Sequence, residues 1–113
     1  MELFTKIRNL KFQDIPDLQG WIGDAKFGLQ QLSNYLDKNE KYDILEIGCG
    51  IGILLACLQE QYPKIITEGI EPYKGGFDRL KATKNLIPKS IGIRNLKFED
   101  FKPRKKYDII YSV

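Results

Sequence analysis

The chain has 113 residues, of which 42% are hydrophobic and 29% charged, so it can form one domain with a core and is too apolar for general disorder. It is too short for a two-domain enzyme or an α/β barrel. The net charge of +3 is too small to indicate a nucleic-acid partner by itself. The longest apolar run, residues 51–58, is too short to span a membrane.

The chain contains two cysteines, Cys49 and Cys57, and no histidine. This inventory excludes a disulfide framework, a Ser-His-Asp triad and a His-ligated metal within these residues, and we expect no metal site. No basic segment followed by an apolar one opens the chain, so we expect no signal peptide and a cytoplasmic location. We interpret the basic residues between 102 and 106 as a solvated loop, with a phosphate or RNA contact as the alternative.

Residues 1–20 show no single pattern. Leu3, Phe4, Ile7 and Leu10 could share one helical face, but Pro16 interrupts it. We predict an N-terminal arm here that packs on the core, and a domain over residues 21–113. A helix that binds a membrane surface or a partner is the alternative for the arm.

Residues 22–38 predict a helix, because Ala25, Leu29, Leu32 and Leu36 recur at helical spacing. Four segments follow in the order strand, turn, helix and strand: residues 42–47, 48–52, 53–62 and 65–70. Pro63 ends the second helix.

The rest of the chain predicts a third helix at residues 75–86 and strands at residues 93–98 and 107–113. Strands that alternate with helices predict an α/β fold with right-handed crossovers and a mostly parallel sheet. Ligands bind such sheets beyond the carboxyl ends of the strands. We therefore expect the functional residues just after Ile47, Ile70 and Phe98, and at Ser112.

Three alternate glycines, Gly48, Gly50 and Gly52, join the first predicted strand to the second helix. Glycine lets the backbone turn sharply and approach a ligand, and the N-terminus of the next helix favours an anionic group. A dinucleotide fingerprint would need a third glycine at position 53 or 55, where Ile53 and Leu55 stand. No Lys-Ser or Lys-Thr pair follows, so this is not a P-loop.

The remaining pattern, acidic-x-Gly-x-Gly-x-Gly from Glu46, resembles motif I of the class I S-adenosylmethionine-dependent methyltransferases. Three further features agree with it. Glu71 ends the second predicted strand, Asp100 follows the third, and residues 107–113 are similar to the family's fourth-strand motif, in which an aromatic-Asp pair opens an apolar strand. The resemblance covers roughly residues 22–113. It implies a Rossmann-like, three-layer α/β/α fold with strand order 3-2-1-4.

The resemblance also implies how S-adenosylmethionine is bound. Gly48, Gly50 and Gly52, with Cys49 as a small filler, match the turn beneath the methionine part of the cofactor. Glu46 matches the acidic residue that orients this turn and faces the cofactor's amino group. The alternative is that Glu46 only caps or pairs near the strand end.

Glu71 matches the residue that accepts both ribose hydroxyls, a role that suits the two oxygens of a carboxylate. An ordinary turn residue is the alternative. Pro72 matches the apolar residue on the adenine face, and Asp100 the acceptor of the adenine amino group, with Glu99 as the alternative. Phe101 would offer its backbone N–H and a covering ring. Ser112, at the end of the fourth strand, completes the expected cofactor-binding set.

The sequence ends at Val113, and the resemblance implies a fold truncated after its fourth strand, with the catalytic and acceptor-binding residues beyond it. The link from Asp100 to Tyr107 is too short to hold a helix and still cross the sheet, so we predict an extended link containing Pro103. The exposed edge of the fourth strand predicts a homodimer through strand pairing.

The sequence therefore predicts an S-adenosylmethionine-dependent methyltransferase with an unidentified acceptor. A non-catalytic cofactor-binding or interaction domain with the same fold is the alternative from another class. A nucleotide-sugar or nicotinamide oxidoreductase with an altered fingerprint is the third hypothesis.

Overall fold

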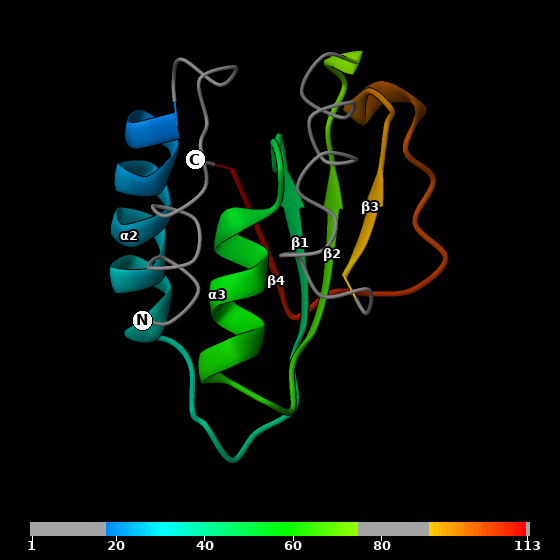
Figure 1. Ribbon diagram of the computed structural model, residues 1–113. Helices are drawn as coiled ribbons and strands as arrows, with labels where there is room; N and C mark the ends of the chain where they lie inside the picture. The colour runs from blue at the N-terminus through cyan, green and yellow to red at the C-terminus, as the bar shows by residue number, and fades with distance from the viewer. Residues whose placement is uncertain (1–17, 75–90, 113) are drawn as a thin grey trace.

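The computed structural model describes residues 18–74 and 91–112, and these form a four-stranded parallel sheet with helices beside it (Figure 1). The strands are β1 (Asp43–Ile47), β2 (Ile66–Ile70), β3 (Gly92–Arg94) and β4 (Ile109–Ser112). Their order is β3-β2-β1-β4, which confirms the predicted α/β fold and strand order. The predicted arm up to residue 17, the predicted helix at 75–86 and Val113 lie outside the described residues.

Helix α2 (Leu18–Ser33) begins four residues earlier and ends five residues sooner than the sequence predicts. Its end is tightened by local bonds, because the Ser33 hydroxyl donates to the Gln30 carbonyl at 2.8 Å and the Tyr35 N–H to the Leu32 carbonyl at 2.9 Å. These bonds satisfy carbonyls that a longer helix would use. Leu36, predicted to lie in the helix, packs on the core from the turn that follows it.

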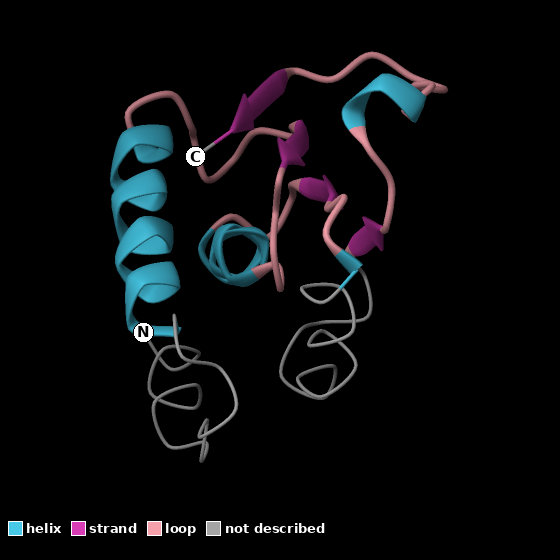
Figure 2. Ribbon diagram, turned by 90° about the horizontal axis from the view of Figure 1, so that it is seen from above, coloured by secondary structure: helices cyan, strands magenta, loops and turns pink. Residues whose placement is uncertain are grey.

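Helix α3 (Ile53–Gln61) lies between α2 and the sheet, and both helices cover the same face (Figure 2). All six residues from Ile53 to Leu58 are buried, which explains why this helix is apolar around most of its surface. The core therefore consists mainly of α3, the inner side of α2 and the side chains of β1 that face the helices.

The opposite face of the sheet is crossed by the link between β3 and β4. The Tyr107 hydroxyl donates to a Glu68 carboxylate oxygen at 2.6 Å, and the Lys105 ammonium pairs with Asp43 at 2.8 Å and Glu68 at 3.2 Å. No helix occurs between residues 101 and 107, so the prediction of an extended link is confirmed. The helical layer expected on this face is not among the described residues.

The predicted strand at residues 93–98 is wrong in its second half. β3 ends at Arg94, and Phe98 begins a short 3₁₀ helix, η1 (Phe98–Asp100), where it is exposed. The Asn95 side chain donates to the Glu71 backbone carbonyl at 2.8 Å, so a side-chain amide takes the place of the next backbone bond between the strands. The chain then leaves the sheet and turns toward the opposite face.

In the two described stretches of the chain, neither α-helix combines the length and the apolar character that crossing a bilayer requires.

Candidate functional site

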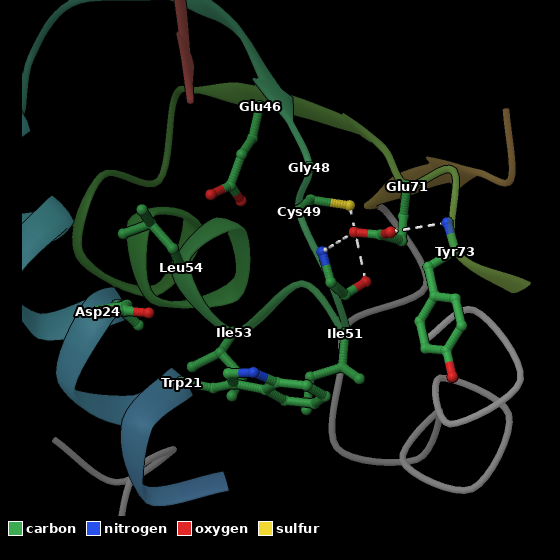
Figure 3. Close-up of a pocket in the computed structure, with 12 residues that line it drawn as sticks. Trp21, Asp24, Glu46, Gly48, Cys49, Ile51, Ile53, Leu54, Glu71 and Tyr73 are labelled. Carbon is green, nitrogen blue, oxygen red and sulfur yellow. Dashed lines mark hydrogen bonds between the residues drawn. The ribbon is translucent and has the colours of Figure 1, made fainter. Parts of the chain in front are cut away.

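A cavity of about 220 Å³ lies beyond the carboxyl ends of β1 and β2 and is bounded on its far side by α2 (Figure 3). This is the position that the parallel sheet predicts for a ligand site. The residues that line it are Trp21, Asp24 and Ala25 of α2, Glu46 of β1, Gly48, Cys49, Gly50 and Ile51 of the turn, Ile53 and Leu54 of α3, and Glu71 and Tyr73 after β2.

The glycine turn at residues 48–52 forms one wall of the cavity. Gly48, Gly50 and Gly52 have φ angles of 76°, 56° and 82°, which side-chain-bearing residues rarely adopt. The N–H groups of Gly48 and Cys49 both donate to the Ile70 carbonyl, at 2.8 and 3.1 Å, so the turn is folded over the end of β2. The alternation of glycines in the sequence thus reflects three left-handed backbone positions.

Glu71 holds this turn from the other side. Its Oε1 accepts the Gly50 N–H at 3.0 Å and its Oε2 accepts the Tyr73 N–H at 2.8 Å (Figure 3). Each carboxylate oxygen has a second lone pair, so these bonds leave acceptor capacity for ligand hydroxyls. Glu71 therefore both fixes the turn and lines the cavity.

Glu46 is the most deeply buried acidic group of the site. Its side chain comes from β1, points into the cavity and is only 4% exposed (Figure 3). Its Oε1 has no hydrogen-bond partner in the part of the chain that the structure describes. Burial raises the pKa of Glu46 to about 8, the Tyr111 hydroxyl opposes this rise, and the negative charge of Glu71 adds to it.

Tyr111 lies directly across from Glu46 on the neighbouring strand β4. Burial raises the pKa of its phenol above the usual value, and the charge of Glu46 raises it further. Although the two side chains are close enough to influence each other's pKa, the Tyr111 hydroxyl makes no hydrogen bond of standard geometry within the described residues. The cavity-lining Glu46 and its cross-strand neighbour Tyr111 therefore both have unsatisfied hydrogen-bonding capacity among the described residues.

Cys49 is unsuited to act as a nucleophile. Burial raises the pKa of its thiol far above the ordinary value, and the charges of Glu46 and Glu71 raise it further. The group stays a thiol at neutral pH, whereas the thiolate is the reactive form. This agrees with the interpretation of Cys49 as a small filler.

The cavity is acidic. Three carboxyl groups line it, from Asp24, Glu46 and Glu71, and none of the twelve described residues that line it is Lys or Arg. No group of these or other described residues has the arrangement of three acidic or thiol side chains that could hold a metal ion. The three carboxyl groups favour a cationic ligand.

The contribution of α2 was only partly predicted. Trp21 and Ala25 are spaced by one helical turn and Asp24 lies beside them, so helical periodicity places all three on one face. The apolar stripe predicted from the sequence includes Ala25, but it does not indicate that Trp21 and Asp24 close a cavity opposite the glycine turn. Ile51, Ile53 and Leu54 were likewise predicted only as turn and helix residues.

Five of the expected cofactor-binding residues do not line the cavity. Gly52 is buried at the start of α3, and Pro72 is exposed beside Tyr73. Asp100 is exposed at the end of η1, and Ser112 is exposed at the end of β4. Phe101 packs with Arg94, whose guanidinium lies 5.1 Å from the ring centre, on the face of the sheet that the link crosses.

Comparison with known proteins identifies the family. A family model described as a methyltransferase domain matches residues 23–113. Two curated relatives are the tRNA1(Val) (adenine(37)-N6)-methyltransferase of Pedobacter heparinus, 34% identical over 79 residues, and the malonyl-[acyl-carrier protein] O-methyltransferase 2 of Ilyobacter polytropus, 35% identical over 81 residues. The alignments cover 66% and 67% of this chain and 33% and 29% of the relatives, so the chain spans about a third of their length.

A solved structure of PKMT2 from Rickettsia typhi in complex with AdoHcy aligns with 63% of this chain and 14% of that chain, at 28% identity and a TM-score of 0.54. The names of the two curated relatives describe different acceptor atoms, a nitrogen and an oxygen, at nearly equal identity. The comparisons therefore agree on methyl transfer and do not identify one acceptor.

Proposed function

This chain belongs to the class I S-adenosylmethionine-dependent methyltransferases, and on that premise we propose that the cavity between the glycine turn and α2 binds the methionine part of S-adenosylmethionine. The observation that carries the proposal is the Glu46 carboxyl, which is buried, points into the cavity and has an oxygen without a partner in the described residues. A cation in the cavity would satisfy it, and S-adenosylmethionine carries two cationic groups.

The other residues fit the same ligand. Glu71 has acceptor capacity left for two hydroxyl groups beyond its bonds to the turn. The cavity volume of about 220 Å³ is below the roughly 300–1,000 Å³ of usual small-molecule sites, so it would hold only part of the cofactor. We propose that the adenosyl part extends past Tyr73 and Pro72 toward η1, where Asp100 and Phe101 are found.

The proposed function is transfer of a methyl group to an acceptor. We propose that the acceptor binds to a site formed by the whole protein. When bound, the cofactor supplies an electrophilic methyl group on its sulfonium. The contribution of this chain is to bind and orient: Glu71 and the glycine turn form a fixed wall, and Glu46 supplies a buried negative counterpart. The Cys49 thiol takes no part, because its raised pKa keeps it protonated.

Trp21 provides a direct assay, because it is the only tryptophan of the chain and lines the cavity. We expect a saturable change of Trp21 fluorescence on titration with S-adenosylmethionine and none with NAD. A folded chain that shows no saturable change and no heat of binding with S-adenosylmethionine would refute the proposal, and so would binding of NAD alone.

A charge-reversal pair locates the site. Asp24 is an exposed residue of α2 that lines the cavity, and Glu40 is an exposed residue outside it. Asp24→Lys should weaken S-adenosylmethionine binding by on the order of tenfold through repulsion of the cation, whereas Glu40→Lys changes the net charge equally and should have little effect. Equal effects of the two substitutions would contradict the placement.

A further inference from the structure

Glu46 stands in an environment that does not stabilise its charge. The side chain is 4% exposed, and its Oε1 has no hydrogen-bond donor in the described stretches of the chain. A carboxylate in such a place would lack both solvation and a counter-ion, which is costly enough that the group takes up a proton instead.

The described polar groups near Glu46 come from β4, the glycine turn, the segment after β2, and α2, whereas α3 contributes the apolar Ile53 and Leu54. Tyr111 of β4 faces it with a hydroxyl, Cys49 of the turn with a neutral thiol, and Glu71 after β2 with a negative charge. Asp24 adds a further carboxylate from α2 on the cavity wall. Within residues 18–74 and 91–112, only the Tyr111 hydroxyl favours the charged form, and no basic side chain lines the cavity.

The two residues paired with Glu46 on the neighbouring strands carry no positive charge. Among the described residues, the cavity is therefore the side from which a cation can reach the Glu46 carboxyl. On β2 the residue paired with Glu46 is Gly69, which has no side chain, and on β4 it is the uncharged Tyr111. The carboxyl points into the cavity (Figure 3). A cationic group of a ligand in the cavity is therefore the counter-ion that Glu46 can reach.

We propose that Glu46 binds a cationic group of the ligand and releases its proton to the solvent as that group enters, so that ligand binding is coupled to proton release. This inference rests on the proposed function. Glu46 is protonated in the free site and charged in the bound site. The affinity of the site for the cationic ligand therefore depends on pH.

The magnitude follows from the two states. With a pKa of about 8 in the free chain, Glu46 is about nine-tenths protonated at pH 7, so binding should release about 0.9 proton. The affinity should rise about tenfold for each pH unit between pH 6 and 7 and stop rising near pH 8, where the free carboxyl is already charged and the α-amino group of the ligand begins to lose its own proton.

Calorimetry measures this release directly. S-adenosylmethionine is titrated at pH 7 in phosphate and in Tris, whose ionisation enthalpies differ, and the difference in observed heat gives the number of protons exchanged. We expect about 0.9 proton released by the wild-type chain and by Glu40→Gln, an exposed control. Glu46→Gln, which resembles the protonated acid, should release none and bind with an affinity that does not rise between pH 6 and 7.

Two further ligands identify the cationic group. S-adenosylhomocysteine has the ammonium and lacks the sulfonium, and 5′-methylthioadenosine has neither. Release retained with S-adenosylhomocysteine assigns the ammonium to Glu46, and release lost with it assigns the sulfonium. Release with methylthioadenosine equal to that with S-adenosylmethionine would overturn the proposal.

The outcomes separate the two proposals. If S-adenosylmethionine binds the wild-type chain with equal heats in both buffers, the proton coupling is wrong and the proposed function stands. If release persists in Glu46→Gln, the proton comes from another group and the assignment is wrong. If a folded chain binds no S-adenosylmethionine, the proposed function fails and this inference fails with it.

Discussion

The substitution Gly69→Ala tests how closely the glycine turn packs against the sheet. Gly69 is the last but one residue of β2, and a side chain here would point toward Cys49 and Leu55, on the side of the sheet that α3 covers. A methyl group at this position would lie 2.5 Å from the Cys49 Sγ, 2.8 Å from the Cys49 Cβ and 2.8 Å from a Leu55 methyl carbon. Distances below 3.0 Å are not tolerated, so something must move in Gly69→Ala.

Little can move without a large cost. Cys49 and Leu55 are buried, and the Cys49 Cβ is fixed by a backbone whose N–H is bonded to the Ile70 carbonyl. Overpacking a core typically costs about 1–3 kcal/mol, and three simultaneous overlaps point to the upper end, about 3 kcal/mol. At roughly 4–8 °C per kcal/mol for a domain of this size, the melting temperature should fall by roughly 12–24 °C.

Gly92→Ala is the matched control for Gly69→Ala. Gly92 lies on the neighbouring strand β3, and its added methyl would meet only the Glu68 Cγ, at the ordinary distance of 3.8 Å. We expect its free energy of unfolding to change by less than about 0.5 kcal/mol. Urea denaturation followed by circular dichroism measures both variants.

A double variant checks the cause. Cys49→Gly removes both atoms that Gly69→Ala would strike in the turn, so the cost of Gly69→Ala should be at least about 1 kcal/mol smaller in that background. The reasoning is refuted if Gly69→Ala is as stable as Gly92→Ala, or if its cost is the same with and without Cys49.

Two other predictions concern Glu46 and the sheet edge. Burial raises the folded-state pKa of Glu46 from 4.5 to about 8, so the stability that Glu46 contributes is present below pH 4.5 and is lost as the pH rises to 8. The free energy of unfolding of Glu46→Gln, measured by urea denaturation, should therefore increase relative to the wild type by up to about 5 kcal/mol across this range. A stability difference that does not change with pH would contradict this. For β4, which pairs only with β1 among the described strands, we propose homodimerisation through its free edge. Sedimentation should show a dimer that Ile110→Lys weakens, and a clean monomer at high concentration would count against it.

The sequence predicts the part of the fold whose signals are local. The three glycines mark three positions of positive φ, and Pro63 marks the end of α3. The predicted bounds therefore agree within about one residue with those observed for β1, the turn, α3 and β2. The strand order followed from the family resemblance. The extended link between residues 101 and 107 could be predicted because the distance to cross and the length of chain nearly match.

The errors lie where tertiary contacts decide. Phe98 has strand propensity, yet the side-chain bond from Asn95 to Glu71 ends β3 early and places Phe98 in η1. Gly69 looks like an ordinary strand residue, and its importance comes from Cys49, twenty residues away. The role of Asp24 depends on where α2 packs, which no local pattern in residues 18–33 determines.

In the proposed site, stability and binding are opposed at Glu46, and this opposition would give the site its specificity for cationic ligands. Burying the carboxyl beside Gly69 and Tyr111 destabilises the free chain at alkaline pH, and a ligand cation would remove that cost when it enters. A neutral ligand of the same shape would leave the cost in place. A protein that replaced Glu46 by a neutral side chain would therefore gain stability and lose its means of distinguishing charged from uncharged ligands, which is a physical reason for the site to retain a buried acid.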